Sequence, residues 1–203
     1  MNNINYDKIQ NQIIKDLKGD AKLLIHSCCA PCSSYCLEKI SPYFKTDVFY
    51  YNPNITSSEE YLKRLEEQIN FVKRVYGDTI RVINGEYNPS DFYTAVKGLE
   101  NQVEGGKRCR ICYQLRLEET AKKAKELSAD MFGTTLTVSP HKNAGVINQI
   151  GVELEKKYKI SFLVADFKKR DGYKRSIVLS KENDIYRQNY CGCKYSIWFD
   201  SKE

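Results

Sequence analysis

Three cysteines stand close together in the stretch Ser27-Cys28-Cys29-Ala30-Pro31-Cys32-Ser33-Ser34. A short apolar run, residues 23–25, precedes it and predicts a buried strand, and residues 35–40 after it predict a helix that Pro42 ends. The stretch is therefore expected to form a strand-to-helix turn, where backbone amides and the helix N-terminus favour negative charge. Such a place favours thiolates, the form of cysteine that binds metals and attacks electrophiles. The alternative is that Cys28 and Cys29 are small core residues, because free cysteine is often buried.

Apolar runs and helical patterns alternate along the rest of the chain. Further strands are predicted at residues 47–51, 79–83, 131–135 and 160–165. Helices are predicted at residues 5–18, from a cap at Thr56 or Ser57 to Gly77, around 92–99, from Cys109 to Leu127, at 143–157 and near 173–188. The predicted helix that ends at Gly77 is expected to bury one apolar stripe, made of Leu62, Leu65, Ile69, Phe71, Val72 and Val75.

This alternation indicates an α/β fold, a doubly wound parallel sheet with helices on both faces. Ligands of such sheets collect outside the carboxyl ends of the strands. We therefore expect the cysteine turn, the loop before His141, and Asp166 after the last strand to share that edge.

Length and composition predict one domain, residues 1–203, with an N-terminal helix within 1–20 and a basic, tyrosine-rich C-terminal segment, 168–203. Apolar residues make up 41% and charged residues 29%, which is ordinary for a globular protein. No run approaches the roughly 18 apolar residues that span a bilayer, and the first residues lack the pattern of a secretory signal. The expected location is cytoplasmic, without a membrane partner.

Cysteine usage indicates metal or redox chemistry, because disulfides are rare in a reducing compartment. The eight cysteines fall into three groups, Cys28/Cys29/Cys32/Cys36, Cys109/Cys112 and Cys191/Cys193. The two histidines are too few for a typical histidine-based metal site.

A Cys-x-x-Cys pair at residues 109 and 112 is expected to open a helix, which directs both sulfurs toward one point. We favour a ligand role over a thioredoxin-like redox pair, because no strand directly precedes the motif. With Cys28 and Cys29 it makes a four-thiolate set that suits a [4Fe–4S] cluster. Cys32 could hold a further metal or a substrate, and Cys36 is expected to pack in the core.

Cys191-Gly192-Cys193 predicts a tight, strained and therefore labile disulfide that can pass two electrons toward the cluster. The alternative is a second metal-binding knuckle. Asp166 could be a general acid, a hard ligand for iron or a helix cap, and His141 could donate protons or be structural.

Positive charge is concentrated near the C-terminus. The whole chain carries +6, and residues 168–195 alone hold eight Lys/Arg against three acids. Tyr173, Tyr186, Tyr190 and Tyr195 alternate with these charges. Basic groups contact phosphates and aromatic rings stack on unpaired bases, which suits a nucleic-acid loop; the alternative is a solvated basic face.

The chain resembles the QueH-type epoxyqueuosine reductases, the cobalamin-independent enzymes that finish queuosine synthesis in tRNA. The matching segments, from about residue 23 to 196, are His26–Cys32, Cys109–Leu117, Thr134–Asn143, Phe162–Lys169, Gly172–Ser176 and Tyr186–Cys193. The resemblance implies a fold similar to the adenine-nucleotide α-hydrolase (HUP-like) proteins, with metal in place of nucleotide at the first turn. It also implies that Cys28, Cys29, Cys109 and Cys112 ligate the cluster and that Cys191 and Cys193 form the redox-active disulfide. Some members carry an additional mononuclear iron, and Cys32 is the matching position.

These observations predict an iron–sulfur oxidoreductase that removes the epoxide oxygen of epoxyqueuosine at the wobble position of tRNA by two-electron deoxygenation. The anticodon loop would lie on the basic segment, and the sequence names neither the electron donor nor the oligomeric state. The alternatives are a zinc-stabilised RNA-binding module and a thiol–disulfide oxidoreductase. Sulfur-transfer enzymes acting on tRNA share the fold, but the phosphate-binding glycines that their use of ATP requires are missing from the turn.

Overall fold

A five-stranded parallel sheet forms the centre of the computed structural model, which describes residues 4–17 and 19–196. The strand order is β3-β2-β1-β4-β5. The strands are β1 (Lys22–His26), β2 (Lys45–Tyr50), β3 (Val82–Asn84), β4 (Met131–Thr134) and β5 (Ser161–Phe162). The predicted doubly wound α/β fold is confirmed.

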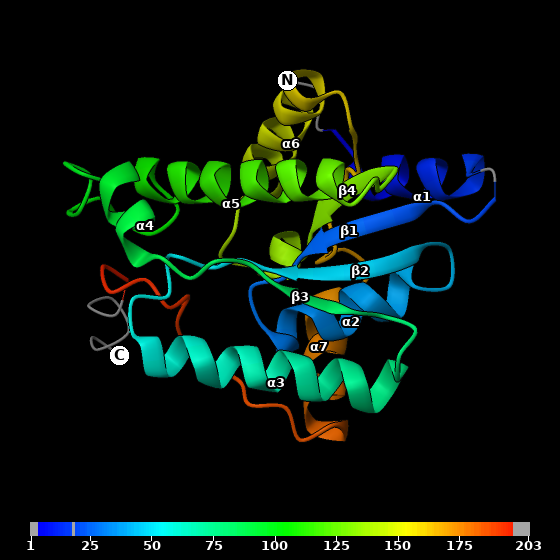
Figure 1. Cartoon of the computed structure of the whole chain (residues 1–203), viewed down its shortest axis with the longest axis horizontal. Coiled ribbons are helices and arrows are strands. Elements are labelled where there is room, and N and C mark those ends of the chain that lie inside the picture. Colours follow the sequence, from blue (N-terminus) through cyan, green and yellow to red (C-terminus); the bar gives the residue numbers. More distant parts are fainter. Residues whose placement is uncertain (1–3, 18, 197–203) are drawn as a thin grey trace.

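Helices cover both faces of the sheet (Figure 1). α5 (Lys107–Glu126) packs on α6 (Ala144–Tyr158) on one side, and α2 (Ala30–Ile40) packs on α3 (Ser58–Tyr76) and α7 (Gly172–Glu182) on the other. The remaining helical elements are α1 (Tyr6–Asp16), α4 (Pro89–Ala95) and the 3-10 turn η1 (Thr135–Val138).

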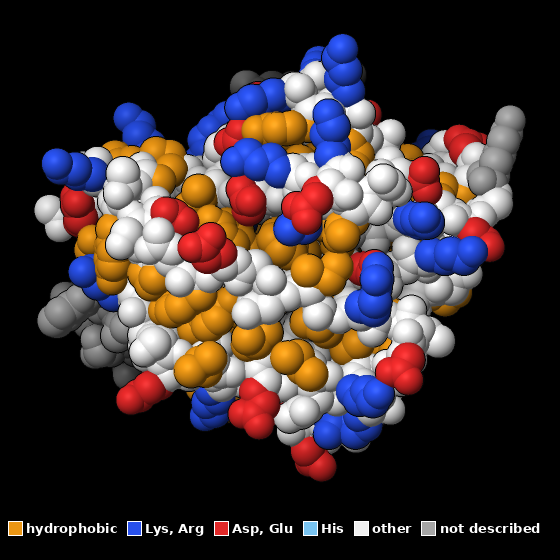
Figure 2. All heavy atoms as spheres, in the orientation of Figure 1, with side chains coloured by type: hydrophobic (Ala, Val, Ile, Leu, Met, Phe, Trp, Pro, Cys, Tyr) orange, Lys and Arg blue, Asp and Glu red, His pale blue; other side chains and the backbone are white. Residues whose placement is uncertain are grey.

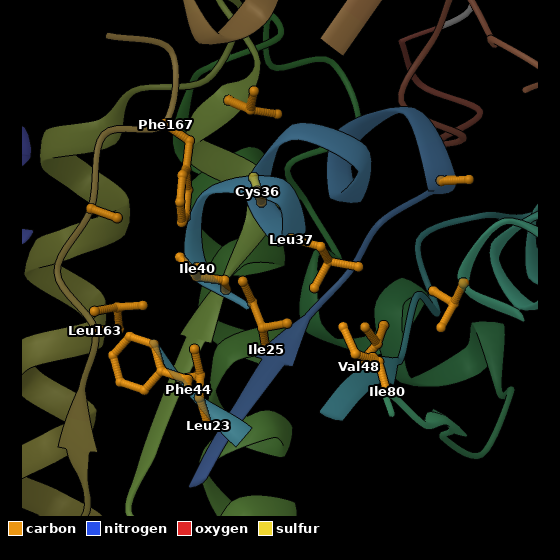
Figure 3. Packing of buried hydrophobic residues seen from close by; sticks show 14 of the residues in the cluster. Leu23, Ile25, Cys36, Leu37, Ile40, Phe44, Val48, Ile80, Leu163 and Phe167 are labelled. Atoms are coloured by element: carbon orange, nitrogen blue, oxygen red, sulfur yellow. The ribbon is translucent and has the colours of Figure 1, made fainter. Parts of the chain in front are cut away.

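The two cores follow from the alternation of side chains along a strand. Leu23 and Ile25 of β1 point to one face, where they pack among the residues of α2 shown in Figure 3. Leu24 points to the other face and packs with Phe132 and Phe162 under α5 and α6. Each such side chain contributes about 1.5–3 kcal/mol on burial. Both faces of β1 are covered, which explains why its three central residues, Leu23, Leu24 and Ile25, are all apolar.

Local signals place the ends of the helices. The side chain of Ser57, and not that of Thr56, caps α3 by accepting a hydrogen bond from the backbone N–H of Glu60. Gly77 follows this helix with a φ of 60°, a conformation that glycine adopts without a steric penalty. Asn143 caps α6 in the same manner as Ser57 caps α3.

Several predicted boundaries need correction. The predicted strand at 79–83 pairs only at Val82–Asn84, and that at 160–165 only at Ser161–Phe162. The helix near 173–188 ends at Glu182.

The expected buried stripe of α3 is wrong in part. Phe71 and Val72 are buried as predicted, but Leu62, Ile69 and Val75 are exposed. The rest of the buried face is formed by Tyr61, Arg64 and Gln68. Figure 2 shows hydrophobic side chains gathered between α3 and α5 on this face of the molecule, with acidic and basic side chains at the border.

β1 lies at the point where the strand order reverses, because it pairs with β2 on one side and β4 on the other. The chain leaves β1 and β4 in opposite directions, which opens a crevice at their carboxyl ends. The cysteine turn follows β1 and η1 follows β4, so both border this crevice. In the part of the chain that the structure describes, no helix combines the length and apolarity required to cross a bilayer.

Candidate metal centre and adjoining cavities

The cysteine turn is held from beneath by hydrogen bonds. Cys29 is the N-cap of α2, and Pro31 lies in the first turn, where its missing N–H is harmless. Ser27 Oγ and Ser33 Oγ both donate to Gln68 Oε1 of α3, at 2.7 and 2.9 Å. The turn is thereby fixed to a neighbouring helix rather than left as a free loop.

The sulfurs of Cys28, Cys29 and Cys32 lie within 4.8 Å of one another. Those of Cys28 and Cys29 are 3.7 Å apart. Hydrogen bonds from the other two thiols lower the pKa of Cys28 well below its usual value, and the same bonds raise the pKa of Cys29 and Cys32. One thiolate is thus stabilised on the turn before any metal binds.

The Cys-x-x-Cys pair opens α5, as predicted. Cys109 Sγ accepts a hydrogen bond of 3.2 Å from the backbone N–H of Gly105, and Cys112 is buried. Both side chains line a cavity of about 20 Å³ together with Cys191 and Cys193. Burial is the main cause that raises the pKa of Cys112 to about 11.

A second cavity, of about 380 Å³, lies beside the cysteine turn. Its wall includes Cys28 and Cys32 from the turn and His141 from the loop after η1. The two cavities adjoin, because they share wall residues, namely Glu104, Arg116, Lys142 and Cys191. Thiols from three distant parts of the chain therefore converge on one region at the carboxyl end of the sheet.

The Cys191–Cys193 loop is hydrogen-bonded to the segment between β2 and α3. Asn54 Nδ2 donates to the carbonyl of Cys191 at 3.3 Å, and the N–H of Thr56 donates to that of Gly192 at 3.1 Å. Gly192 has a φ of 93°, and a Cβ there would lie 2.7 Å from Ile55 Cγ1, so only glycine fits. All eight cysteines are free thiols, and the predicted disulfide stays a prediction.

Two cations stand in the shared wall. Arg116 is 3% exposed, and its Nε donates to the carbonyl of Cys112 at 3.3 Å. Burial alone would lower the pKa of Lys142, but the sulfurs of Cys28, Cys32 and Cys191 outweigh it and raise that pKa. Both side chains therefore present positive charge to the thiols.

Other candidate residues lie at different places. Cys36 is fully buried among the residues of the first core, as predicted. Among the described residues, Asp166 is not part of either thiol cavity; it pairs with Lys168 at 3.3 Å and lines a separate cavity of about 510 Å³ beside the start of α6.

His26 is a structural residue. It is fully buried, with Nε2 3.1 Å from the carbonyl of Tyr51 and Nδ1 3.1 Å from Thr134 Oγ1. A carbonyl only accepts, so the proton is on Nε2, and burial lowers the pKa of the ring to about 3.

The basic C-terminal segment contributes one wall of the larger cavity through Tyr173, Ser176, Arg187, Gln188, Asn189 and Tyr190. It is held against α3, since the guanidinium of Arg64 lies over the Tyr190 ring at 5.0 Å and donates to its carbonyl. Cationic and aromatic groups thus stand directly beside the thiols.

Sequence reasoning assigned no role to Arg64, Arg116 or Lys142. The position of Arg116 beside the thiols could have been predicted, because residues 109, 112 and 116 are spaced i, i+3, i+7 and share one face of a helix. The position of Arg64 could not, since an arginine on an amphipathic helix usually marks the solvent side.

The donor set fits a thiophilic metal or an iron–sulfur cluster. Sulfur ligands on the turn and on α5 are soft donors, and cations in the wall offset the negative charge of bound thiolates. A tetrahedral ion with metal–sulfur bonds of about 2.3 Å places sulfurs about 3.8 Å apart. The turn thiols alone are close enough for one ion, whereas a cluster would draw on both sides of the shared wall.

Comparison with known proteins gives one consistent result. A family model described as epoxyqueuosine reductase QueH matches residues 23–198. A Streptococcus pyogenes serotype M1 protein of that description is 42% identical over 199 residues, which cover 95% of this chain and 78% of that protein. One from Staphylococcus epidermidis is 42% identical over 95% of this chain and 84% of its own length. One from Thermotoga maritima is 41% identical over 86% and 90%, respectively.

Proposed function

The chain belongs to the epoxyqueuosine reductase QueH family, and we propose that it reduces epoxyqueuosine in tRNA to queuosine at a metal centre held by its own thiols. It is an oxidoreductase. The observation that carries the proposal is the convergence of turn, α5 and C-terminal thiols on two adjoining cavities.

Cys28, Cys29, Cys109 and Cys112 are proposed as the ligands of a [4Fe–4S] cluster, with Cys32 able to hold an additional iron. Such a centre supplies single electrons and a Lewis acid for the epoxide oxygen. The mutual hydrogen bonds of the turn thiols support this assignment, because a metal replaces the protons that they share.

Cys191 and Cys193 are proposed as the two-electron reserve. Oxidation of the dithiol to a disulfide releases two electrons and two protons. The epoxide takes up the same number when its oxygen leaves as water and a carbon–carbon double bond forms, so the reaction balances. An external reductant then restores the dithiol.

Protons are proposed to reach the oxygen by way of His141, which lines the larger cavity. Asp166 is further from this role, because its cavity is a separate one and its carboxylate pairs with Lys168.

The larger cavity is proposed to receive the modified nucleotide of the anticodon loop. Its volume of about 380 Å³ is in the range of small-molecule sites. The tyrosine rings of residues 173 and 190 could stack on a base, and Arg187 could contact a phosphate.

The first test is the metal content of protein purified without oxygen. About four iron and four sulfide per chain, or one iron more, are expected. Stoichiometric zinc without sulfide would contradict the reductase centre and favour the zinc-stabilised RNA-binding module.

The second test is substitution of a proposed ligand. Cys112→Ala is expected to abolish conversion of epoxyqueuosine-tRNA in an anaerobic assay and to lower the iron content. Cys36→Ala is the matched control, because that thiol is buried in the core away from both cavities and its loss leaves the ligand set complete. Full activity of the Cys112→Ala enzyme would refute the cluster assignment.

A further inference from the structure

The charge of Arg116 is the feature that the proposed reaction does not yet use. Arg116 lies on α5, one turn beyond Cys112 and two turns beyond Cys109, so it shares their face of the helix. Its side chain is 3% exposed and contributes to the walls of both thiol cavities. A guanidinium is charged at every pH at which the protein is folded.

Burial of such a charge is costly unless anionic groups lie near it. Arg116 shares the walls of the two cavities with the thiols of Cys28, Cys112 and Cys191. Its Nε is already occupied by the carbonyl of Cys112, and its guanidinium lies 5.8 Å from the centre of the Tyr113 ring. The side chain is thus held in place, with its charge in the wall that encloses the thiols.

The position and charge of Arg116 together indicate an effect on the reduction potential of the metal centre. Each electron added to an iron–sulfur cluster adds one negative charge, and the net charge and hydrogen bonds around a cluster set its reduction potential. A fixed cation in a region of low dielectric constant stabilises the reduced form more than the oxidised form. Solvent does not screen this effect, because the guanidinium is buried.

We propose that Arg116 is a positioning residue that raises the reduction potential of the metal centre, and that Lys142, from the same shared wall, acts in the same direction. The inference rests on the proposed iron–sulfur function. On this proposal, one helix sets the reduction potential of the centre, because α5 carries both the ligands Cys109 and Cys112 and the charge of Arg116.

The test is a redox titration of anaerobically prepared holoprotein, with a chemical one-electron donor and the signal of the reduced cluster as readout. Arg116→Gln removes the charge but keeps a hydrogen-bond donor. We expect it to lower the equilibrium constant for one-electron reduction about tenfold, a shift of about 59 mV to lower potential. Arg116→Lys keeps the charge and is expected to titrate close to the wild-type protein.

Lys122→Gln is the matched control, because it removes one positive charge from the solvent side of the same helix, where the side chain is 52% exposed. It is expected to leave the midpoint unchanged. An unshifted midpoint in Arg116→Gln, or an equal shift in Lys122→Gln, overturns the proposal.

Three further outcomes also test the proposal. If Arg116→Gln holds no cluster, Lys142→Gln is titrated in its place, and an unshifted midpoint there overturns the inference. Zinc without iron in the wild-type protein overturns the proposed function and this inference together. Iron and sulfide in the wild-type protein, together with an unshifted midpoint in Arg116→Gln, overturn this inference but leave the proposed function standing.

Discussion

Gly192 shows how one residue can control the position of two thiols. Its positive φ and its close contact with Ile55 leave no room for a side chain. Gly192→Ala is expected to reduce stability by about 1–3 kcal/mol and to lower reductase activity at least tenfold, while the iron content is retained because no proposed cluster ligand moves with the loop.

Urea unfolding, metal analysis and the tRNA assay measure these three quantities. Gly98→Ala is the control, since Gly98 also has a positive φ, of 80°, but no atom within 4 Å of the added Cβ. Wild-type activity in Gly192→Ala would show that the exact position of the Cys191–Cys193 loop is unimportant.

At the residue scale, the sequence predicted thiols better than it predicted their surroundings. Cysteines at short spacings are rare enough to stand out, and every one of them outside the core reaches the cavities or the turn. The wall residues Arg64 and Arg116 are ordinary members of helices in the sequence, and only tertiary packing shows which charged side chains point inward.

At the scale of elements, α3 supports the cysteine turn at the start of α2. Gln68 is fully buried and accepts hydrogen bonds from Ser27 and Ser33. Gln68→Ala leaves both hydroxyls without this acceptor, so we expect the free energy of unfolding of the reduced, metal-free protein to fall by about 2–3 kcal/mol. Metal affinity is expected to weaken as well, because the turn is held less firmly.

Urea unfolding and competition with a chelator measure the two effects. Glu66→Ala, an exposed change on the same helix, is the control and is expected to stay within about 0.5 kcal/mol of wild type. Unchanged stability and affinity in Gln68→Ala would contradict a supporting role for α3.

The elements themselves were largely predictable, and their limits were less so. Helices with clear caps, such as α3 with Ser57 and Gly77, were placed to within about a residue. The length of β5 was overestimated because the chain stays apolar through residue 165 and buries Leu163 and Ala165, although its pairing with β4 stops at Phe162. The buried face of α3 was predicted in part, since Phe71 and Val72 are buried as expected. Arg64 and Gln68 were missed because they are polar residues that hold the C-terminal segment and the cysteine turn.

At the scale of the whole molecule, Asp7 joins three separate parts of the chain. Its carboxylate pairs with Lys39 of α2 and with Arg170 before α7, each at 2.9 Å. Burial opposes ionisation, but the hydrogen bonds and charges of Lys39 and Arg170 outweigh it and hold the pKa below 3.8. The stabilisation is therefore complete above pH 3.8 and is lost as the pH falls through the lower value of the folded protein.

Asp7→Asn is expected to reduce stability at neutral pH by about 1–2 kcal/mol, and the gap to wild type should close below pH 3.8. Urea midpoints of the metal-free protein across this range measure it. Asp20→Asn, which breaks an exposed pair with Lys45, is the control and should matter little. A gap that stays constant down to acidic pH would refute the assignment.

The overall topology was predictable because parallel strands joined by helices leave few arrangements, and a sheet of this order directs its ligand to the crevice beside β1. The convergence of residues 28–32, 109–112 and 191–193 on that crevice follows from the fold. Their distances, and the division of the space into two cavities, depend on side-chain packing that the sequence pattern does not encode.

The central position of β1 has a consequence for the route by which the chain folds. Its pairing with β2 closes a short loop, whereas its pairing with β4 joins residues as far apart as His26 and Thr134, 108 positions along the chain. Loop-closure entropy must be overcome before such distant contacts contribute, so this half of the sheet forms late. Until it does, we expect the turn thiols to lack the wall that encloses them and to be more open to dissolved oxygen during refolding than in the folded protein.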